Sequence, residues 1–228
     1  MNIGHLNAII TKDIKDTIRN FQVLILFLVF PVIGFVMTQS IKDASSAFFI
    51  SIFATMHFVF TPIVVTASLI SEEKEKNTLR VLRMSGISSI EFMISTTLFV
   101  LLLNIVTGCT FIGMTDMEQA RVLQFIVAGI IGCLISIIIG ICVGTFAKSS
   151  SAANGLAVPA GMMFSFLPML SSFNEGLEKI TKFLYGQQIS YLIEGNQWSV
   201  EMLIVIICNF FIAFMVYCYL YNKSKQIE

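Results

Sequence analysis

The chain has 228 residues, of which 56% are hydrophobic and 12% are charged, and its formal net charge is zero. Its mean hydropathy is +0.86, and so few polar residues cannot cover the surface of a soluble globule of this size. The composition therefore indicates an integral membrane protein. A nucleic-acid partner is excluded, because that class of binding needs a basic face.

The first twenty residues precede any apolar span and have a helical pattern. One face carries residues at steps of three and four, namely Ile3, Leu6, Ile10, Ile14, Thr17 and Phe21. The other face carries the charged residues Lys12, Asp13, Lys15, Asp16 and Arg19. A secretory signal would instead have a short basic start and an apolar core. We predict an amphipathic helix over residues 1–20 in the cytoplasmic membrane interface. A solvated tail that only flanks the first span is the alternative.

Six apolar stretches approach or exceed the ~20 residues with which a helix crosses a bilayer. They are residues 21–38, 47–70, 90–113, 122–147, 154–170 and 200–221. Runs this long without turn residues are not strands, and the alternation of a membrane barrel is missing. We predict an all-α membrane protein in which residues 21–228 form one six-helix domain. Pro159 and Pro168 are positions where the fifth helix can bend or end.

The distribution of basic residues predicts the orientation of the chain. With both termini in the cytoplasm, ten of the fourteen Lys and Arg residues fall in cytoplasmic segments. The four outside are Lys42, Arg121, Lys179 and Lys182. Because cytoplasmic loops carry the excess of basic residues, this orientation is favoured. It places the polar segment 71–91 in the cytoplasm and the segment 171–198 outside.

Ion-coupled carriers and intramembrane enzymes are disfavoured. No Lys, Arg, Asp or Glu falls in the middle of a predicted span, where carriers and proton relays need ionisable groups. His57 is the sole ionisable candidate, and we interpret it as a hydrogen-bonded packing residue. The two histidines lie far apart, and the five cysteines fall within spans without C-x-x-C spacing. We therefore expect no catalytic residue, metal site or cofactor in this chain.

The segment 71–91 predicts a short charged helix followed by a new span. Ser71 can cap a helix whose first turn carries Glu72, Glu73 and Glu75, with Arg80 and Arg83 near the other end. Leu79 and Leu82 would form an apolar edge. Gly86 ends this helix, and Ser88 with Glu91 three residues later forms a capping box that starts the third span. The segment is interpreted as a rigid element that transmits force, or alternatively as a solvated charged loop.

The same segment resembles the loop between the second and third spans of ABC-2 type permeases. The similarity covers Glu72-Glu73-Lys74-Glu75-Lys76-Asn77-Thr78-Leu79, Ser85-Gly86-Ile87-Ser88 and Glu91-Phe92. The resemblance implies that residues 72–83, including Arg80 and Arg83, form a coupling helix that docks on an ATPase subunit. The chain departs from the family pattern at Asn77, Gly86, Thr96 and Thr97, where Gly, Pro and a following Lys are common. Asn tolerates the same left-handed backbone as Gly.

The external segment 171–198 fits the same family, which folds short helices back toward the membrane before the last span. Apolar residues at helical spacing predict two such helices on either side of Gly186, with faces at Leu177, Ile180, Leu184, Ile189 and Leu192. The aromatic residues Tyr185, Tyr191 and Trp198 suit a membrane interface.

Small residues recur every four positions in the fourth and fifth predicted spans. The fourth carries Ala128, Gly132, Ser136, Gly140 and Gly144, and the fifth carries Ala153, Ala157, Gly161 and Ser165. Such stripes let helix backbones approach closely. We predict a packing seam between spans four and five within one chain. The resemblance offers an alternative, in which the stripe of the fifth span lines a contact between two permease halves.

The chain contains no G-x-x-x-x-G-K-[ST] motif, so ATP hydrolysis would require another subunit. The resemblance implies the permease of a type V ABC exporter in a bacterial cytoplasmic membrane, with a second permease copy or paralogue. A separate ATPase subunit would bind ATP and Mg²⁺. For cargo we expect an amphipathic or hydrophobic peptide first, then a drug or lipid. A non-transport immunity or sensor protein, and an independent channel or carrier, remain the alternatives.

Overall fold

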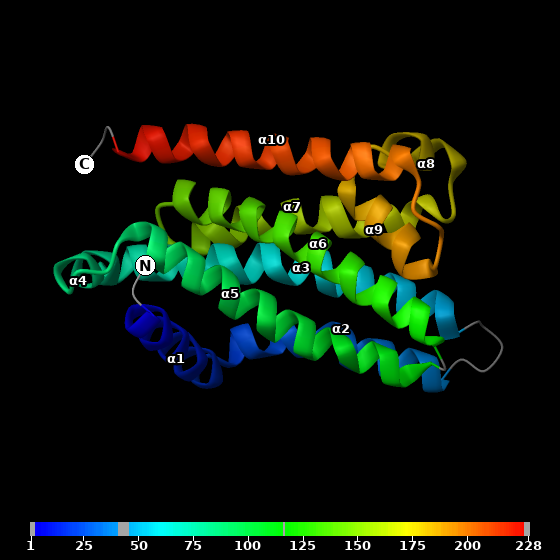
Figure 1. Cartoon of the computed structure of the whole chain (residues 1–228), viewed down its shortest axis with the longest axis horizontal. Coiled ribbons are helices and arrows are strands. Elements are labelled where there is room, and N and C mark those ends of the chain that lie inside the picture. Colours follow the sequence, from blue (N-terminus) through cyan, green and yellow to red (C-terminus); the bar gives the residue numbers. More distant parts are fainter. Residues whose placement is uncertain (1–2, 41–45, 116, 226–228) are drawn as a thin grey trace.

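The computed structural model describes residues 3–40, 46–115 and 117–225, without the side chains of residues 3–6, 46, 79, 80, 83 and 221–225. The described residues form helices joined by short connections, and no strand occurs among them (Figure 1). The elements in chain order are α1 (Ile3–Arg19), α2 (Phe21–Ser40), α3 (Ser46–Glu75), α4 (Thr78–Met84), α5 (Ser89–Gly108), the 3-10 helix η1 (Cys109–Met114), α6 (Gln119–Phe146), α7 (Ser150–Ser171), α8 (Glu175–Thr181), α9 (Tyr185–Glu194) and α10 (Val200–Lys225).

Six of these helices have the length and composition of membrane spans: α2, α3, α5 with η1, α6, α7 and α10. The prediction of six spans in an all-α chain is confirmed for the described residues. α7 remains one helix through Pro159 and Pro168. In Figure 1, α1, α4 and the end of α10 lie at one end of the bundle, and α8 and α9 lie at the other.

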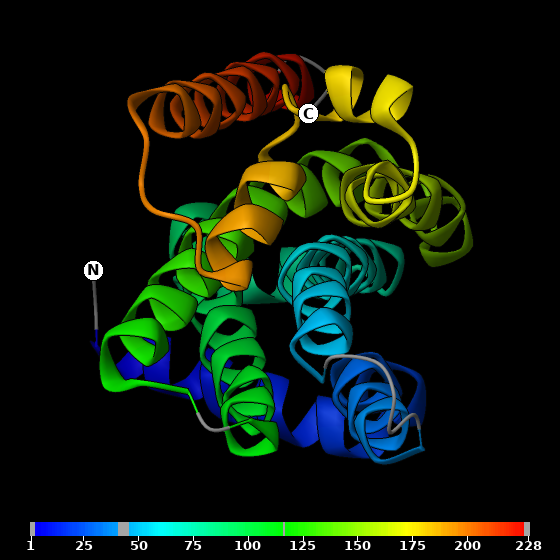
Figure 2. The same cartoon turned by 90° about the vertical axis from the view of Figure 1, so that its right-hand side faces the viewer.

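α3 is the central helix of the bundle. It packs against α2, α5, α6, α7 and α9, and Figure 2 shows it surrounded by its neighbours. Within its membrane-spanning window 78% of the residues are buried, against 11% for α10. A helix that is buried to this extent must be apolar on all of its faces, and the sequence of α3 is apolar in this way up to Ile70. The other spans are therefore positioned mainly by their contacts with α3.

Gly140 and Gly144 of α6 and Gly161 of α7 face α3, so these residues do not form the predicted seam between spans four and five. A Cβ added at Gly140 would lie 2.7 Å from the carbonyl oxygen of Ile63, and one at Gly144 would lie 2.9 Å from that of Ala67. Gly161 of α7 lies equally close to the ring of Phe60. α3 carries bulky side chains between its two neighbours, so α6 and α7 each approach it through small residues.

Both stripes are therefore covered within one chain. Ala157 is fully buried and Ser165 is 1% exposed, and the Ser165 hydroxyl donates to the carbonyl of Gly161 in its own helix at 2.7 Å. Gly132 of α6 lies against Ile189 of α9, and Ser136 is hydrogen-bonded to Tyr185 at 2.9 Å. The alternative role of the stripe in the fifth span, a contact between two permease halves, stays a prediction.

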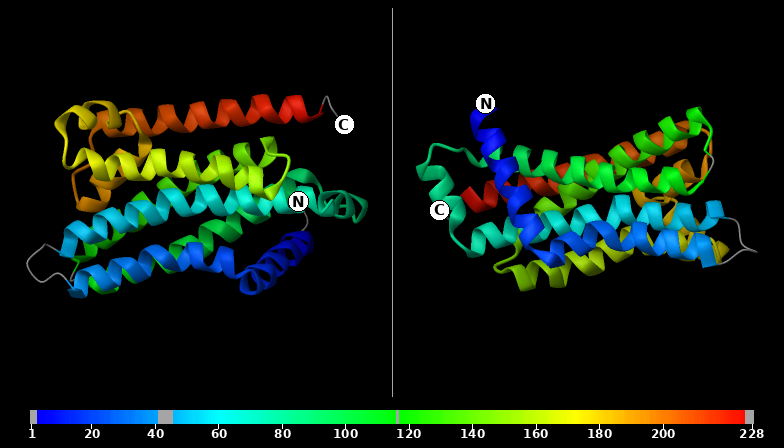
Figure 3. Two further views of the ribbon diagram at one scale, coloured as in Figure 1. Left: turned by 180° about the vertical axis from the view of Figure 1, so that it is seen from behind. Right: turned by 90° about the horizontal axis from the view of Figure 1, so that it is seen from below.

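α9 folds back onto the spans, as the sequence predicts for the segment after Gly186. Tyr185 and Ile189 are fully buried, and Gly186 lies directly on the carbonyl of Phe164 in α7. Pro168 has no N–H to donate to that carbonyl, which is four residues earlier in the helix. The missing Cβ of Gly186 leaves the space in which the two backbones meet. Figure 3 shows α7 and α9 from the other side of the bundle.

We predict that Gly186→Ala lowers the thermal stability of the purified chain. Its Cβ would lie 1.8 Å from the Phe164 carbonyl oxygen, so α9 must shift, at a cost of about 1–3 kcal/mol. Gly155→Ala in α7 is the matched control, because nothing lies within 4 Å of its added Cβ. Melting temperatures in detergent, followed by size-exclusion fluorescence, distinguish the two variants. Equal melting temperatures would contradict this account of α9.

Candidate functional site: the turn between α3 and α4

α3 runs past the predicted end of its span and carries the acidic cluster on its last turn. The prediction that Ser71 caps a separate charged helix is wrong, because Ser71 lies inside α3. Its hydroxyl donates to the carbonyl of Ser68 at 3.0 Å instead of capping N–H groups. No Gly or Pro interrupts the sequence here, so the established helix continues through Ser71 to Glu75. We call residues 72–78 the α3–α4 turn.

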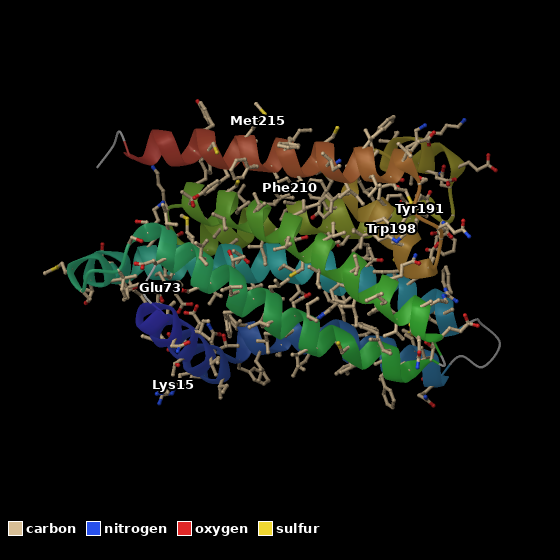
Figure 4. The ribbon with its side chains drawn as sticks, viewed as in Figure 1. Lys15, Glu73, Tyr191, Trp198, Phe210 and Met215 are labelled. Carbon is tan, nitrogen blue, oxygen red and sulfur yellow. The ribbon has the colours of Figure 1, made fainter. Side chains whose placement is uncertain are left out.

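Carboxylates at the C-terminal end of a helix oppose the helix dipole, so they need partners. The carboxylate of Glu73 is ion-paired with Lys12 of α1 and accepts a hydrogen bond from the hydroxyl of Thr78. The same hydroxyl also lies 2.9 Å from the carbonyl oxygen of Glu73. The Glu73 side chain is only 12% exposed, and Figure 4 shows it in the region between α1 and α4. Glu73 thus connects α1, α3 and α4.

The next two residues connect α3 to the corner between α6 and α7. The ammonium group of Lys74 donates to the carbonyls of Thr145 and Ala147 at 2.7 and 2.9 Å, at the C-terminal end of α6. The carboxylate of Glu75 accepts the backbone N–H of Ser150 at 2.8 Å, at the first residue of α7. A cation on a helix C-terminus and an anion on a helix N-terminus are both favourable placements. Adjacent residues of α3 therefore bind the ends of two other spans.

The remaining charges of the segment pair along the surface. Glu72 and Lys76 form an ion pair four residues apart at the end of α3, and the Lys76 side chain is 62% exposed. Asn77 then has a left-handed backbone with φ of 55°, which Asn adopts more readily than most residues. The departure from the family's Gly at this position thus keeps the same turn.

α4 ends and α5 begins as the sequence predicts. Gly86 has φ of 82°, and the N–H of Ile87 reaches back to the carbonyl of Leu82 at 3.0 Å, which forms a Schellman cap. Ser88 and Glu91 form both hydrogen bonds of a capping box, at 3.0 Å from the Ser88 N–H and 3.2 Å from the Glu91 N–H. These caps fix the direction in which α4 leaves the bundle.

The apolar edge of α4 differs from the predicted edge at Leu82, whereas Leu79, the other predicted residue, is not tested. Val81 is 60% exposed and Met84 is 82% exposed, whereas Leu82 packs against the core. The side chains of Leu79, Arg80 and Arg83 lie outside the described part of the structure. The sequence holds a signal for this difference, because the glycine cap pairs residue 87 with residue 82 and turns Leu82 inward.

α1 packs on α5 through a face that combines Asp13, which the sequence pattern assigned to the charged side, with Thr17, which it assigned to the apolar side. Ile9, Asp13 and Thr17 are each less than 5% exposed, whereas Ile14 and Ile18 are exposed. The carboxylate of Asp13 lies 3.4 Å from the hydroxyl of Thr96 on α5. Of the expected apolar stripe, Ile14 and Phe21 are exposed, whereas Thr17 is buried against the bundle. The ion pair of Lys12 with Glu73 and the contact of Asp13 with Thr96 explain which face of α1 is turned toward the bundle.

Burial raises the pKa of Asp13 to about 6. The charges of Glu73 and Asp16 also raise it, whereas Lys12 and the hydrogen bond from Thr96 lower it. Desolvation is the largest of these effects, because a carboxylate loses more hydration free energy on burial than the neutral acid does.

His57 is a hydrogen-bonded packing residue, as predicted. It is fully buried in α3, and its Nε2 lies 2.9 Å from the carbonyl oxygen of Asn104 on α5. The amide of Asn104 donates in return to the carbonyl of His57 at 3.2 Å. Among the described residues, no group of three or more His, Cys, Asp or Glu side chains is arranged to hold a metal ion.

We predict that the chain gains stability as the pH falls from neutral through about 6 toward 3.8, because the folded state binds a proton at Asp13 before the unfolded state does. Asp13→Asn should remove this component, so the stability difference between the two proteins should shrink at low pH. Melting temperatures of both proteins across this pH range measure it. A difference that stays constant with pH would contradict the assignment.

Comparison with known proteins identifies the family of the chain. The family described as ABC-2 family transporter protein matches residues 4–217. None of the curated proteins matches the chain. The family match extends from the start of α1 into the last third of α10, so it includes the α3–α4 turn and most of all six spans. The chain is a multi-pass membrane protein that belongs to the ABC-2 transporter family.

Proposed function

We propose that this chain is the permease of an ATP-driven ABC exporter in a bacterial cytoplasmic membrane. ABC-2 permeases normally work with a separate ATPase subunit, and the family match supports this role. The partner subunit would bind ATP and Mg²⁺, because the printed sequence has no phosphate-binding loop of its own. Two permease halves, either identical or paralogous, would form the membrane unit. Both termini and α4 would lie in the cytoplasm.

The ATPase would contact α4. This helix projects beyond the spans at one end of the bundle (Figure 1), and its edge at Val81 and Met84 is the exposed apolar surface nearest the α3–α4 turn. Two neighbouring apolar side chains on a rigid, capped helix fit a groove in a protein partner. The charged residues of the α3–α4 turn would not dock on the ATPase, because their ion-pair and hydrogen-bond partners lie within the chain.

The α3–α4 turn would carry the motion of α4 to the spans, and this is the observation on which the proposal depends. Thr78 at the start of α4 is bonded to Glu73, and Glu73 is paired with Lys12 of α1. Lys74 and Glu75 hold the ends of α6 and α7. A displacement of α4 therefore acts on α1, α3, α6 and α7 together. Movements of packed helices relative to one another are a known form of conformational switching.

We infer an amphipathic or hydrophobic peptide as the cargo, ahead of a drug or lipid. The chain has 21 Phe and 12 Met residues, and Met side chains adapt to partners of varied shape. No Lys, Arg, Asp or Glu lies near the middle of a span in the sequence, so the membrane interior of this chain presents no charged partner. Such a surface suits apolar side chains better than it suits a polysaccharide.

We predict that Met84→Asp lowers the amount of ATPase subunit recovered with a tagged permease by about tenfold or more. Met84 is 82% exposed, so the change leaves the fold intact. Lys148→Asp, at the exposed corner between α6 and α7, is the control at the same end of the bundle. Mass spectrometry of the purified complex quantifies the recovered ATPase. Undiminished recovery with Met84→Asp would place the contact elsewhere.

We predict that Glu73→Gln keeps the ATPase bound but lowers cargo-stimulated ATP hydrolysis in reconstituted vesicles by about tenfold. The neutral amide loses the ion pair to Lys12, so α4 and α1 no longer move together. Glu72→Gln is the matched control, because Glu72 pairs with Lys76 on the surface of the same turn. If Glu73→Gln hydrolyses ATP and exports cargo like Glu72→Gln, the turn is not the coupling element.

A further inference from the structure

A cavity of about 450 Å³ lies between α1, the start of α2 and the adjoining ends of α3 and α5. One wall is formed by the Lys12–Glu73 pair, and the opposite wall is the corner between α1 and α2, at Arg19 and Asn20. The proposed coupling role uses only the first wall. Nothing in that role explains the residues at the corner or the space between the two walls.

The cavity contains a buried hydroxyl without a partner. Thr17 lines it and is 3% exposed, yet its hydroxyl has no hydrogen-bond partner among the residues that the structure describes. A buried hydroxyl left unpaired destabilises the fold, and a Val side chain of the same shape would avoid this cost. The Thr17 oxygen has less than 1 Å² of exposed surface, so a molecule in the cavity bonds it once the side chain turns toward the cavity.

Charges of both signs stand at the mouth of this cavity. Arg19 is exposed, and no ion-pair partner for it occurs among the described residues. The side chain of Asp16 is 53% exposed and reaches only Lys12, at 3.2 Å. A guanidinium group favours phosphate as a partner, whereas a carboxylate favours an ammonium group. A purely anionic ligand would face the carboxylates of Asp16 and Glu72, so a zwitterionic ligand fits this mouth better.

Exposed apolar side chains flank the cavity at the corner between α1 and α2. Ile18 and Phe21, on either side of the corner, are 67% and 71% exposed, and such a surface is stable only against lipid. Val23 and Phe92 line the cavity itself. Since α1 meets the first span here, the mouth lies at the level of the lipid headgroups. A molecule with a charged head and acyl chains satisfies both parts of the site.

We propose that this cavity binds the headgroup of a zwitterionic aminophospholipid, such as phosphatidylethanolamine. The phosphate contacts Arg19, the ammonium contacts Asp16, and the hydroxyl of Thr17 bonds a polar atom of the bound lipid. The acyl chains lie along Ile18 and Phe21. The bound lipid joins the α1–α2 corner to the end of α3. This binding is a property of the chain alone and does not depend on its role in transport.

The first test is native mass spectrometry of the full chain, purified in detergent with equal amounts of phosphatidylethanolamine and phosphatidylglycerol of the same acyl chains. We expect preferential retention of phosphatidylethanolamine, reduced about tenfold by Arg19→Gln, since one charge-assisted contact is lost. Lys15→Gln is the matched control, because Lys15 lies on the same helix, points away from the bundle in Figure 4 and does not line the cavity. Asp16→Asn should remove the preference for the amine.

Three outcomes of this test would overturn the proposal. One is equal retention of the two lipids by the unmodified chain, which indicates a surface that only attracts phosphate. Another is an equal loss with Lys15→Gln, which indicates a diffuse basic face. The third is displacement of the lipid by water-soluble phosphoethanolamine at equal concentration, which indicates a site for a free phosphate compound.

The second test uses Thr17→Val and a stability readout. Without added lipid the variant should melt at the same temperature as the unmodified chain or higher, because an unpaired buried hydroxyl is removed. With phosphatidylethanolamine the unmodified chain should gain stability by ligand linkage, and the variant should gain less. An equal gain in both proteins, or a lower melting temperature of the lipid-free variant, would show that Thr17 serves the fold and not a ligand.

Discussion

The neutralisation of the acidic end of α3 is the interaction on which the rest of this structure depends. α3 is the most buried span, and its last turn carries three carboxylates where the helix dipole disfavours them. The ammonium group of Lys12 pairs with Glu73, and the N-terminus of α7 donates to Glu75. Charges that would have weakened a free helix end instead determine where α1, α6 and α7 lie at this end of the bundle.

The position of α3 also explains the unusual composition of its neighbours. A helix that is enclosed on all sides leaves no room for large side chains on every partner, so α6 and α7 contact it through glycine and alanine. Bulky groups on α3, such as Phe58 and Phe60, then occupy the space. The backbones of α3 and α6 meet at Gly140 and Gly144, close to the polar turn. In the proposed function, a motion of the turn would pass to spans that are in direct backbone contact.

The sequence predicts the parts of this fold that depend on local physics. Apolar length identifies the six spans, and the spacing of Ser88 and Glu91 identifies the start of α5, because both signals involve only neighbouring residues. The sequence does not predict which helices pack against one another in space. Gly140 and Gly161 indicate close packing, but their periodicity does not say which helix approaches. Similarly, Ser71 has the chemistry of a cap, and only the continuity of α3 through it decides against that role.

The central claim is that α4 and the corner between α6 and α7 move as one body. Double electron–electron resonance distances between spin labels at residues 85 and 148, in a variant without the native cysteines, test this most directly, because residue 85 follows α4 and is exposed without belonging to the proposed contact at Val81 and Met84. The complex would be compared at rest and trapped with ATP. The account predicts the same distance between the two labels at rest and with ATP. In the Glu73→Gln variant it predicts a second, different distance. A distance that shifts with ATP in the unsubstituted turn would contradict it.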